Sequence, residues 1–259
     1  MPRLAREKSE TGIYHVIIRG ANKQEIFHDE EDNLKFLETL KKNKEETELN
    51  VYGWCLMGNH VHLLLREGNE SLSTTMKRIG VSFVWFYNQK YETTGHLFQD
   101  RFKSEPVETD KYLLTVIRYI HQNPVKARLV KRPAEWKWSS SSAYYEKETY
   151  PKDLLDCEFI LSLLSENKKK AKKLFIEFNE RESQDKCLED TAEERLRLSD
   201  EEARMEISNK LQEINIAQVK GLPKKRRDEI LRKIKTIDGL SQRQAARILG
   251  ISPSLIFKA

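Results

Sequence analysis

The sequence predicts an α+β fold: a ferredoxin-like antiparallel sheet with helices on one face, followed by a helical C-terminal extension. Two observations predict it. Up to about residue 150, strand-like and helix-like stretches follow one another in the order strand, helix, strand, strand, helix, strand, helix. Beyond that point glycine is absent until Gly221, and Lys and Glu dominate, which indicates helices. The first part has the split βαβ order, in which the first and third strands lie side by side at the centre of the sheet.

Short stretches rich in β-branched and aromatic residues predict four strands, at residues 12–19, 49–57, 60–66 and 96–107. The first is bounded by glycines. Gly58 and Asn59 have the chemistry of a tight turn, so the second and third strands are expected to form a hairpin. The fourth strand rests on a weaker alternation of apolar and polar residues.

Amphipathic spacing predicts three helices in the same region, at residues 29–40, 71–91 and 109–122. In the first, Leu34, Leu37 and Leu40 recur at intervals of three after an acidic start. Thr109 has the side chain of an N-cap for the third helix. These helices complete the order expected for the sheet.

The whole chain is expected to contain an α+β domain over residues 1–148, a helical connecting region over 149–220 and a small module over 221–259. In the small module, the stretch "LSQRQAARILGISPSLI" predicts a helix-turn-helix. Ser241 would cap its first helix, Gly250 would make the turn, and Pro253 would open the second helix.

Charge is unevenly distributed along the 259 residues, although the net charge is only +5. Residues 111–138 contain seven Lys or Arg and one acidic residue, and residues 222–259 contain ten Lys or Arg and three acidic residues. Between them, residues 177–213 are acidic. Two basic regions predict two surfaces for a polyanion, and ordinary solvated helix faces are the alternative.

The three cysteines are widely spaced and contain no CxxC pair, which favours a reducing cytoplasm over a disulfide framework or a zinc site. No apolar run is long enough for a membrane span, and the first residues lack the apolar stretch of a secretory signal. We therefore expect a cytoplasmic protein without a membrane partner.

His60 and His62 are one residue apart in the third predicted strand. Side chains alternate across a strand, so both imidazoles project from the same face, roughly 7 Å apart at Cβ. Two neutral imidazoles can bind one divalent metal ion. A pair of histidines alone is weak evidence for a metal site, and the interpretation needs a third ligand and a reacting group.

Both could come from the third predicted helix. Tyr119 and Asn123 are four residues apart, hence one turn apart on one face, and an amide oxygen suits a hard cation. Pro124 biases Asn123 away from helical dihedral angles, so the helix could end or kink there. Tyr112, seven residues before Tyr119, lies on nearly the same face, and spacing alone does not choose between the two tyrosines.

Several motifs in a fixed order resemble a known family. The stretches are "YHVIIRGANKQEIF", "WCLMGNHVHLLL", "LFQDRFKSEPVETDKYLLTVIRYIHQNPVKARLV" and "WSSSSAYY". Together, over about residues 10–146, they resemble the REP-associated tyrosine transposases of the single-tyrosine HUH (IS200-like) family. The resemblance implies that His60, His62 and Asn123 bind a metal ion and that Tyr119, rather than Tyr112, is the nucleophile. It also implies the same ferredoxin-like sheet.

The resemblance further implies an enzyme that uses Mg²⁺ or Mn²⁺ to cleave and rejoin single-stranded or hairpin DNA through a 5′-phosphotyrosine intermediate. Candidate DNA-binding residues are His15, Arg19, Arg101 and Lys103 in the first domain and Arg243 and Arg247 in the C-terminal module, where duplex DNA could bind. A homodimer is compatible with the sequence, and no small-molecule substrate is expected.

Two alternatives stay open. One is a domesticated protein that recognises DNA hairpins or repeats without mobilising them. The other is a rolling-circle initiator or relaxase, which shares the His-x-His pair and a tyrosine but usually has a different motif order. We prefer the transposase because Tyr119 follows the histidines and carries the Asn-Pro signature.

Overall fold

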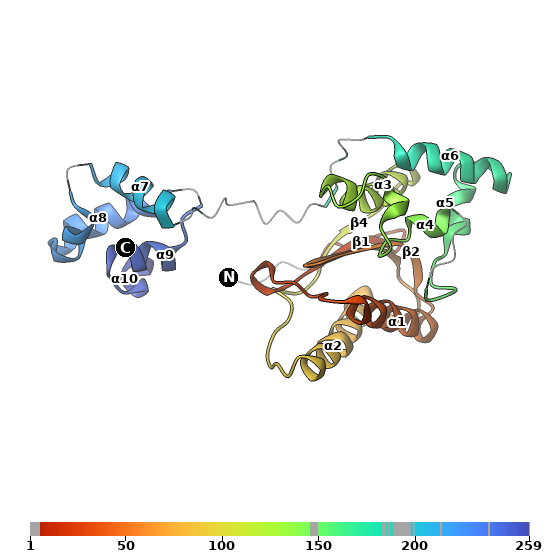
Figure 1. Ribbon diagram of the computed structural model, residues 1–259, viewed down its shortest axis with the longest axis horizontal. Coiled ribbons are helices and arrows are strands. Elements are labelled where there is room, and N and C mark those ends of the chain that lie inside the picture. Colours follow the sequence, from red (N-terminus) through yellow and green to blue (C-terminus); the bar gives the residue numbers. More distant parts are fainter. Residues whose placement is uncertain are drawn as a thin grey trace. The chain divides into compact units, whose positions relative to one another are not determined.

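The computed structural model describes residues 6–145, 150–182, 185, 187–188, 198, 200–212, 214–237 and 239–258. The chain forms two compact units, Met1–Leu188 and Glu189–Ala259 (Figure 1). This division differs from the expected connecting region over 149–220. The reason is packing, because the helices between residues 157 and 180 join the core of the first unit, whereas the helix from residue 200 joins that of the second.

The first unit is built on a four-stranded antiparallel sheet in the order β2-β3-β1-β4. Its strands are β1 (Ile13–Arg19), β2 (Asn50–Met57), β3 (His60–Arg66) and β4 (Lys103–Pro106). The expected antiparallel sheet, with the first and third strands at its centre, is confirmed. The fourth strand is much shorter than the predicted 96–107, because only residues 103–106 pair with β1.

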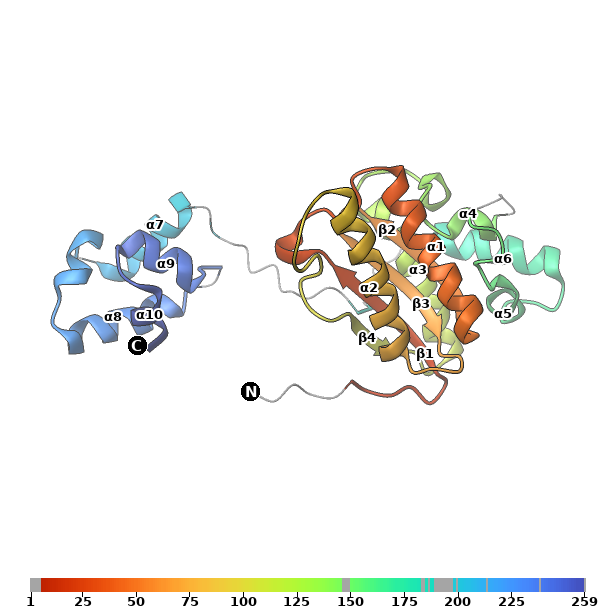
Figure 2. The same ribbon diagram turned by 90° about the horizontal axis from the view of Figure 1, so that it is seen from below.

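Helices α1 (Glu30–Thr47) and α2 (Leu72–Lys90) cover one face of the sheet, as Figures 1 and 2 show. They share an apolar core with the strand residues that point to that side, including Val16, Trp54 and Leu63. Asp29 begins α1 with a capping box, and Ser71 caps α2 through the backbone N–H of Thr74. These two helices lie on one face, as the sequence predicted.

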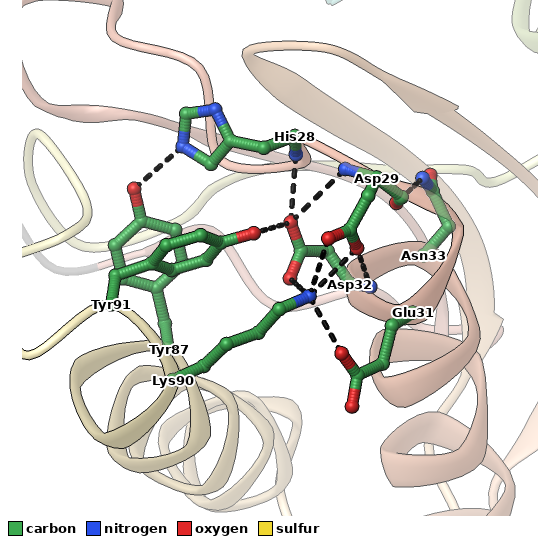
Figure 3. Close-up of polar contacts among 8 residues, drawn as sticks. All are labelled: His28, Asp29, Glu31, Asp32, Asn33, Tyr87, Lys90 and Tyr91. Carbon is green, nitrogen blue, oxygen red and sulfur yellow. Dashed lines mark hydrogen bonds and ion pairs between the residues drawn. The ribbon is translucent and has the colours of Figure 1, made fainter.

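A polar network joins the start of α1 to the end of α2 (Figure 3). The carboxylate of Asp32 is fully buried and accepts hydrogen bonds from Lys90 Nζ at 2.9 Å and from the Tyr91 hydroxyl at 2.7 Å. It also accepts the backbone N–H of His28 at 2.7 Å. Lys90 also pairs with Asp29 and Glu31. A buried carboxylate with this many partners fixes the two helices against each other.

The opposite face of the sheet is covered as well, by α3 (Asp110–Lys126). The expectation of helices on one face therefore holds for α1 and α2 and not for α3. The reason is that residues on both faces of the strands are apolar, so Leu64, Cys55 and Ile13 need a covering element too. Gly53 in β2 allows Ile117 of α3 to approach closely, because a Cβ at that position would collide with it.

Four shorter elements continue this layer: the 3₁₀ turn Pro133–Glu135 and the helices α4 (Ser141–Tyr144), α5 (Cys157–Ser162) and α6 (Lys168–Glu180). His121 of α3 is buried among them, within 2.8 Å of Ser140 Oγ and 3.1 Å of Asn179 Oδ1. Burial lowers the pKa of His121 to about 3, so the ring is neutral. It is a packing residue between α3 and α6.

The segment between α3 and α5 also covers the outer edge of β2. The backbone N–H of Leu56 donates to Trp138 O, and the N–H of Ser140 donates to Trp54 O. Farther along, Val51 N–H donates to the Asp156 carboxylate, while the N–H of Asp156 donates to Val51 O. The backbone groups that an edge strand leaves unpaired are thus bonded within the chain.

The second unit is helical, with its own core centred on residues such as Ile207, Leu231 and Leu249. Its elements are α7 (Asp200–Leu211), the 3₁₀ turn Ile216–Gly221, α8 (Lys224–Lys235), α9 (Gln242–Leu249) and α10 (Pro253–Lys258). Ser241 caps α9, and Gly250 ends it in the left-handed conformation with φ 63°. Across the described ranges of both units, no helix has the length and apolarity that a membrane crossing requires.

Candidate active site

The histidines lie on the sheet face that α3 covers. In the antiparallel register Arg19 is opposite His60 and Ile17 is opposite His62, so His15, Arg19, His60 and His62 all project from that face. The ring centres of His60 and His62 are 5.0 Å apart. The expected pair of imidazoles on one side of β3 is therefore present.

His15 and His62 are in direct contact. Nε2 of His15 is 3.1 Å from Nδ1 of His62, and the rings stack with their centres 5.4 Å apart. Both side chains are buried, at 0% and 2% exposure. His15 therefore has no access to solvent, where DNA would lie, and a direct DNA contact by this residue is at odds with its position.

Helix α3 places Tyr119 over the histidines. The ring centre of Tyr119 is 5.8 Å from those of both His15 and His62, and it meets each ring edge-on. The side chain is 7% exposed. Three aromatic rings thus meet at one point between the sheet and the helix, with His60 beside them.

Tyr112 has a different environment. Its hydroxyl donates a hydrogen bond of 2.7 Å to Glu105 Oε2 on β4. Burial and this bond to a carboxylate raise the pKa of Tyr112 above its ordinary value. A phenol held by a carboxylate is a poorer source of phenolate, so the geometry favours Tyr119 over Tyr112 as a nucleophile.

Asn123 keeps its place one turn from Tyr119, because α3 continues through Pro124 to Lys126. Its Nδ2 donates a hydrogen bond of 2.8 Å to the carbonyl oxygen of Tyr119. That bond directs the amide nitrogen toward the helix and gives Oδ1 the opposite orientation. The helix neither ends at Gln122 nor breaks at Pro124, since its last turn is held by bonds such as Ala127 N–H to Asn123 O.

A divalent metal would have to use the two histidines with a neutral oxygen ligand. Within the described residues, no three or more His, Cys, Asp and Glu side chains gather as a metal cluster. His62 contacts His15 through Nδ1, and His60 Nδ1 lies 2.6 Å from Asn59 Oδ1, so Nε2 of each ring is the nitrogen that a metal would meet. With an amide oxygen and water to complete it, this mixed donor set suits Mn²⁺ better than Mg²⁺, because Mg²⁺ prefers oxygen ligands throughout.

The field at the site is positive. Burial lowers the pKa of His62 well below its ordinary value, and the nearby His60, His15, Arg19 and Lys126 lower it further. A buried neutral imidazole is the form that binds a metal ion. Lys126 places its ammonium 4.4 Å from the centre of the Tyr119 ring. Lys126 was not among the residues predicted from the sequence, although its spacing of seven residues from Tyr119 puts it on the same helix face.

Two other candidate DNA-binding residues of the first unit, Lys103 and Arg101, lie on different faces of the sheet. Lys103 on β4 is opposite Ile17, hence on the same sheet face as the histidines. Arg101 is exposed and lines a cleft beside α2 with Arg6 and Trp85. Ile18, which points away from the histidines, lines that cleft too, so Arg101 lies on the α2 side of the sheet.

Arg243 and Arg247 are both exposed on α9 of the second unit.

Arg118, next to Tyr119 in the chain, forms a two-point ion pair with Asp185, with N–O distances of 2.8 and 2.9 Å. Its guanidinium also lies over the ring of Phe178, 4.0 Å from the centre. Asp185 thus lies beside α3.

Comparison with known proteins finds a similarity within the first unit. Residues 8–123 match the family model described as IS200-like transposase. The REP-associated tyrosine transposase of Escherichia coli (strain K12) is 25% identical over 114 residues, which are 43% of this chain and 66% of that protein. The match thus spans just under two thirds of the relative's length.

A solved structure, described as a REP-associated tyrosine transposase bound to a REP hairpin, is similar with a TM-score of 0.49 and 20% identity. It covers 58% of this chain and 89% of that one. The matched region of this chain contains β1, the hairpin with both histidines, and α3 as far as Asn123. Residues 8–123 are therefore similar to the IS200-like transposases.

Proposed function

We propose that this chain is a metal-dependent DNA transposase that cleaves and rejoins single-stranded or hairpin DNA with Tyr119 as its nucleophile. The observation that carries the proposal is the meeting of Tyr119 with His62 and His15, at 5.8 Å between ring centres, in a region similar to the IS200-like transposases. The tyrosine and the histidines are far apart in the sequence, and the fold brings them together at one point of the sheet.

The reaction would proceed by covalent catalysis. Oη of Tyr119 attacks the phosphorus of a DNA phosphodiester, the new O–P bond forms, and the bond from phosphorus to the 3′-oxygen breaks. The phenol loses its proton, and the leaving 3′-oxygen ends as a hydroxyl. The 5′-phosphate stays attached to Tyr119. Attack by a 3′-hydroxyl on this phosphotyrosine rejoins DNA without a nucleoside triphosphate, because the intermediate retains a phosphodiester bond.

His60, His62 and Asn123 would hold the Mg²⁺ or Mn²⁺ ion. Such an ion, when bound, polarises the phosphate and offsets the charge that develops on it. Arg19 and Lys126 supply further positive charge beside His62, which suits a phosphate that must come close to the tyrosine. Tyr119 contacts the rings of His15 and His62 and the ammonium of Lys126.

The second unit would bind duplex DNA. In α8, Lys224, Lys225 and Arg226 are exposed at the start of the helix, and Arg243 and Arg247 are exposed on α9. We interpret α9 and α10, with Gly250 between them, as the expected helix-turn-helix. Since α10 has only six residues, phosphate contacts by the basic side chains are expected to dominate over base reading.

The test uses the full chain with a DNA hairpin carrying single-stranded flanks, in the presence of Mn²⁺. A covalent protein–DNA adduct on a denaturing gel is expected, and Tyr119→Phe should abolish it. The matched control is Tyr112→Phe, which removes the other hydroxyl from the same helix and should leave the adduct in place.

Loss of the adduct in Tyr112→Phe with retention in Tyr119→Phe would reassign the nucleophile. Tight hairpin binding by the unaltered chain, with no adduct under any metal condition, would instead favour the repeat- or hairpin-binding protein without mobilising activity. A second measurement, the thermal unfolding midpoint of each variant, separates loss of chemistry from loss of the fold.

A further inference from the structure

The contact between His15 and His62 constrains where their protons are. Nε2 of His15 and Nδ1 of His62 are 3.1 Å apart, and between two neutral rings only one of these nitrogens carries the shared hydrogen. If His62 Nδ1 carries it, the opposite nitrogen of His62, Nε2, has a lone pair. If His15 carries it, His62 Nε2 is protonated and cannot bind a metal ion.

The surroundings of His15 indicate that this contact is more than packing. The residue is fully buried, and its neighbours on the same strand face, Ile13 and Ile17, are apolar. Among the residues that the structure describes, Nδ1 of His15 is buried without a hydrogen-bond partner, and the polar contact of the ring is the one with His62. An aliphatic residue would fill the position without a buried polar atom, so packing alone does not account for a histidine here.

We propose that His15 is a positioning residue, which accepts a hydrogen bond from His62 Nδ1 on its own Nε2 and thereby presents Nε2 of His62 to the metal ion. This inference rests on the metal site of the proposed function. A ring nitrogen that binds a metal is oriented by the hydrogen bond that the other nitrogen makes. Usually the acceptor is a carboxylate, a carbonyl group or water, and here a second imidazole takes that place.

His15 also touches Tyr119, with ring centres 5.8 Å apart, so its loss could disturb the nucleophile directly. A useful experiment therefore measures the state of His62 and its metal affinity, neither of which involves the tyrosine chemistry. Two substitutions differ in the relevant property. His15→Gln keeps a side-chain oxygen that can accept from His62 Nδ1, and His15→Leu removes the acceptor.

The first measurement is the ¹⁵N chemical shift of both imidazole nitrogens of His62 in the metal-free full chain. The expected result is a protonated Nδ1 and an unprotonated Nε2, retained in His15→Gln. His15→Leu should shift the ring toward the Nε2-protonated tautomer. Protonation at Nε2 of His62 in the unaltered chain would overturn the proposal.

The second measurement is the Kd of Mn²⁺ for the same proteins, from the electron paramagnetic resonance signal of unbound Mn²⁺. Loss of an orienting partner typically weakens metal binding by roughly 10- to 100-fold, and we expect this for His15→Leu with substantial recovery in His15→Gln. Ile17→Val, at the buried strand position opposite His62, is the control for a general packing defect and should bind Mn²⁺ normally.

These measurements distinguish a wrong role for His15 from a wrong metal site. If the unaltered chain and His15→Leu bind Mn²⁺ equally well, while His62→Ala does not bind it, the role of His15 is overturned and the metal site stands. If the unaltered chain binds no Mn²⁺, the proposed metal-dependent function is overturned, and the role of His15 with it. Should His15→Leu fail to fold, a His15→Gln chain that folds but binds Mn²⁺ as weakly as His62→Ala would also overturn the proposal.

Discussion

Lys126 adds a positive charge next to the proposed nucleophile. Its ammonium lies 4.4 Å from the centre of the Tyr119 ring, two helical turns farther along α3. The same charge contributes to the lowered pKa of His62. A cation in this position can stabilise both a phenolate and the phosphate it attacks.

We expect Lys126→Gln to slow adduct formation by roughly 100-fold, the size of effect seen when one preorganised electrostatic contact is removed. Stability should change by only about 0.5–1 kcal/mol, because an exposed cation–π contact contributes no more than that. Single-turnover cleavage kinetics and urea unfolding measure the two effects. Lys131→Gln, an exposed lysine beyond the helix, is the control. Equal slowing by both variants would point to a general loss of positive charge.

At the scale of residues, the sequence could place only those side chains that regular structure fixes. His60 and His62 share a face because strands alternate strictly, and Asn123 follows Tyr119 by one helical turn. The contact of His15 with His62 depends on the register in which β1 pairs with β3, and spacing along the chain does not determine that register. Arg101 lies in a segment without regular structure, so no periodicity could show that it is on the α2 side.

At the scale of elements, the junction of α1 and α2 depends on a buried charge. Asp32 is fully buried and binds Lys90 and Tyr91, whereas Glu31, which also pairs with Lys90, has a side chain 67% exposed (Figure 3). The two acidic residues are neighbours in the chain and share one partner. Their difference in burial should therefore decide how much each contributes to the stability of the junction between α1 and α2.

We expect Asp32→Ala to lower the free energy of unfolding of the first unit by about 2–4 kcal/mol, since it removes the acceptor of the Tyr91 hydroxyl and of the His28 N–H, and each polar group left unsatisfied costs about 1–3 kcal/mol. Glu31→Ala should cost about 1 kcal/mol or less, as for an exposed ion pair. Urea unfolding followed by circular dichroism measures both. Similar losses in the two variants would contradict the assignment of the junction to Asp32.

The limits of prediction at this scale have physical causes. The strand residues 60–66 were predicted with the observed bounds because an apolar run follows a turn directly. The helix expected to end near Gln122 extends to Lys126, since Pro124 lies near its end and removes a single N–H from a helix that is packed along its length. The strand expected at 96–107 has only four residues in the structure. Alternation of apolar and polar residues shows that a segment is compatible with a strand, but it does not show whether another strand pairs with it.

At the scale of the whole molecule, two units with separate cores predict two separable DNA interactions. The first would act on single-stranded or hairpin DNA at Tyr119, and the second would bind duplex phosphates through α8 and α9. Loss of charge in the second unit should then alter DNA affinity without altering the chemistry of the first.

We expect the triple variant Lys224→Ala, Lys225→Ala, Arg226→Ala to bind duplex DNA more weakly and to reduce the slope of log K against log salt by up to about 2.7, or about 0.9 for each phosphate contact. Adduct formation on a hairpin at saturating DNA should be unchanged. Fluorescence anisotropy at several salt concentrations measures the slope. The same number of exposed lysines in α6, changed as Lys168→Ala, Lys169→Ala, Lys170→Ala, forms the control. Equal reductions in both triples would argue against a duplex site on α8.

The outer edge of β2, which is hydrogen-bonded within the chain, limits how this sheet can pair with a strand of another molecule. Trp138, Ser140 and Asp156 engage its outward backbone groups, so a strand from a second chain can add there only by displacing that segment. The protein is thereby guarded on this side against edge-to-edge aggregation. Two copies that joined their sheets into one continuous sheet would have to do so along β4.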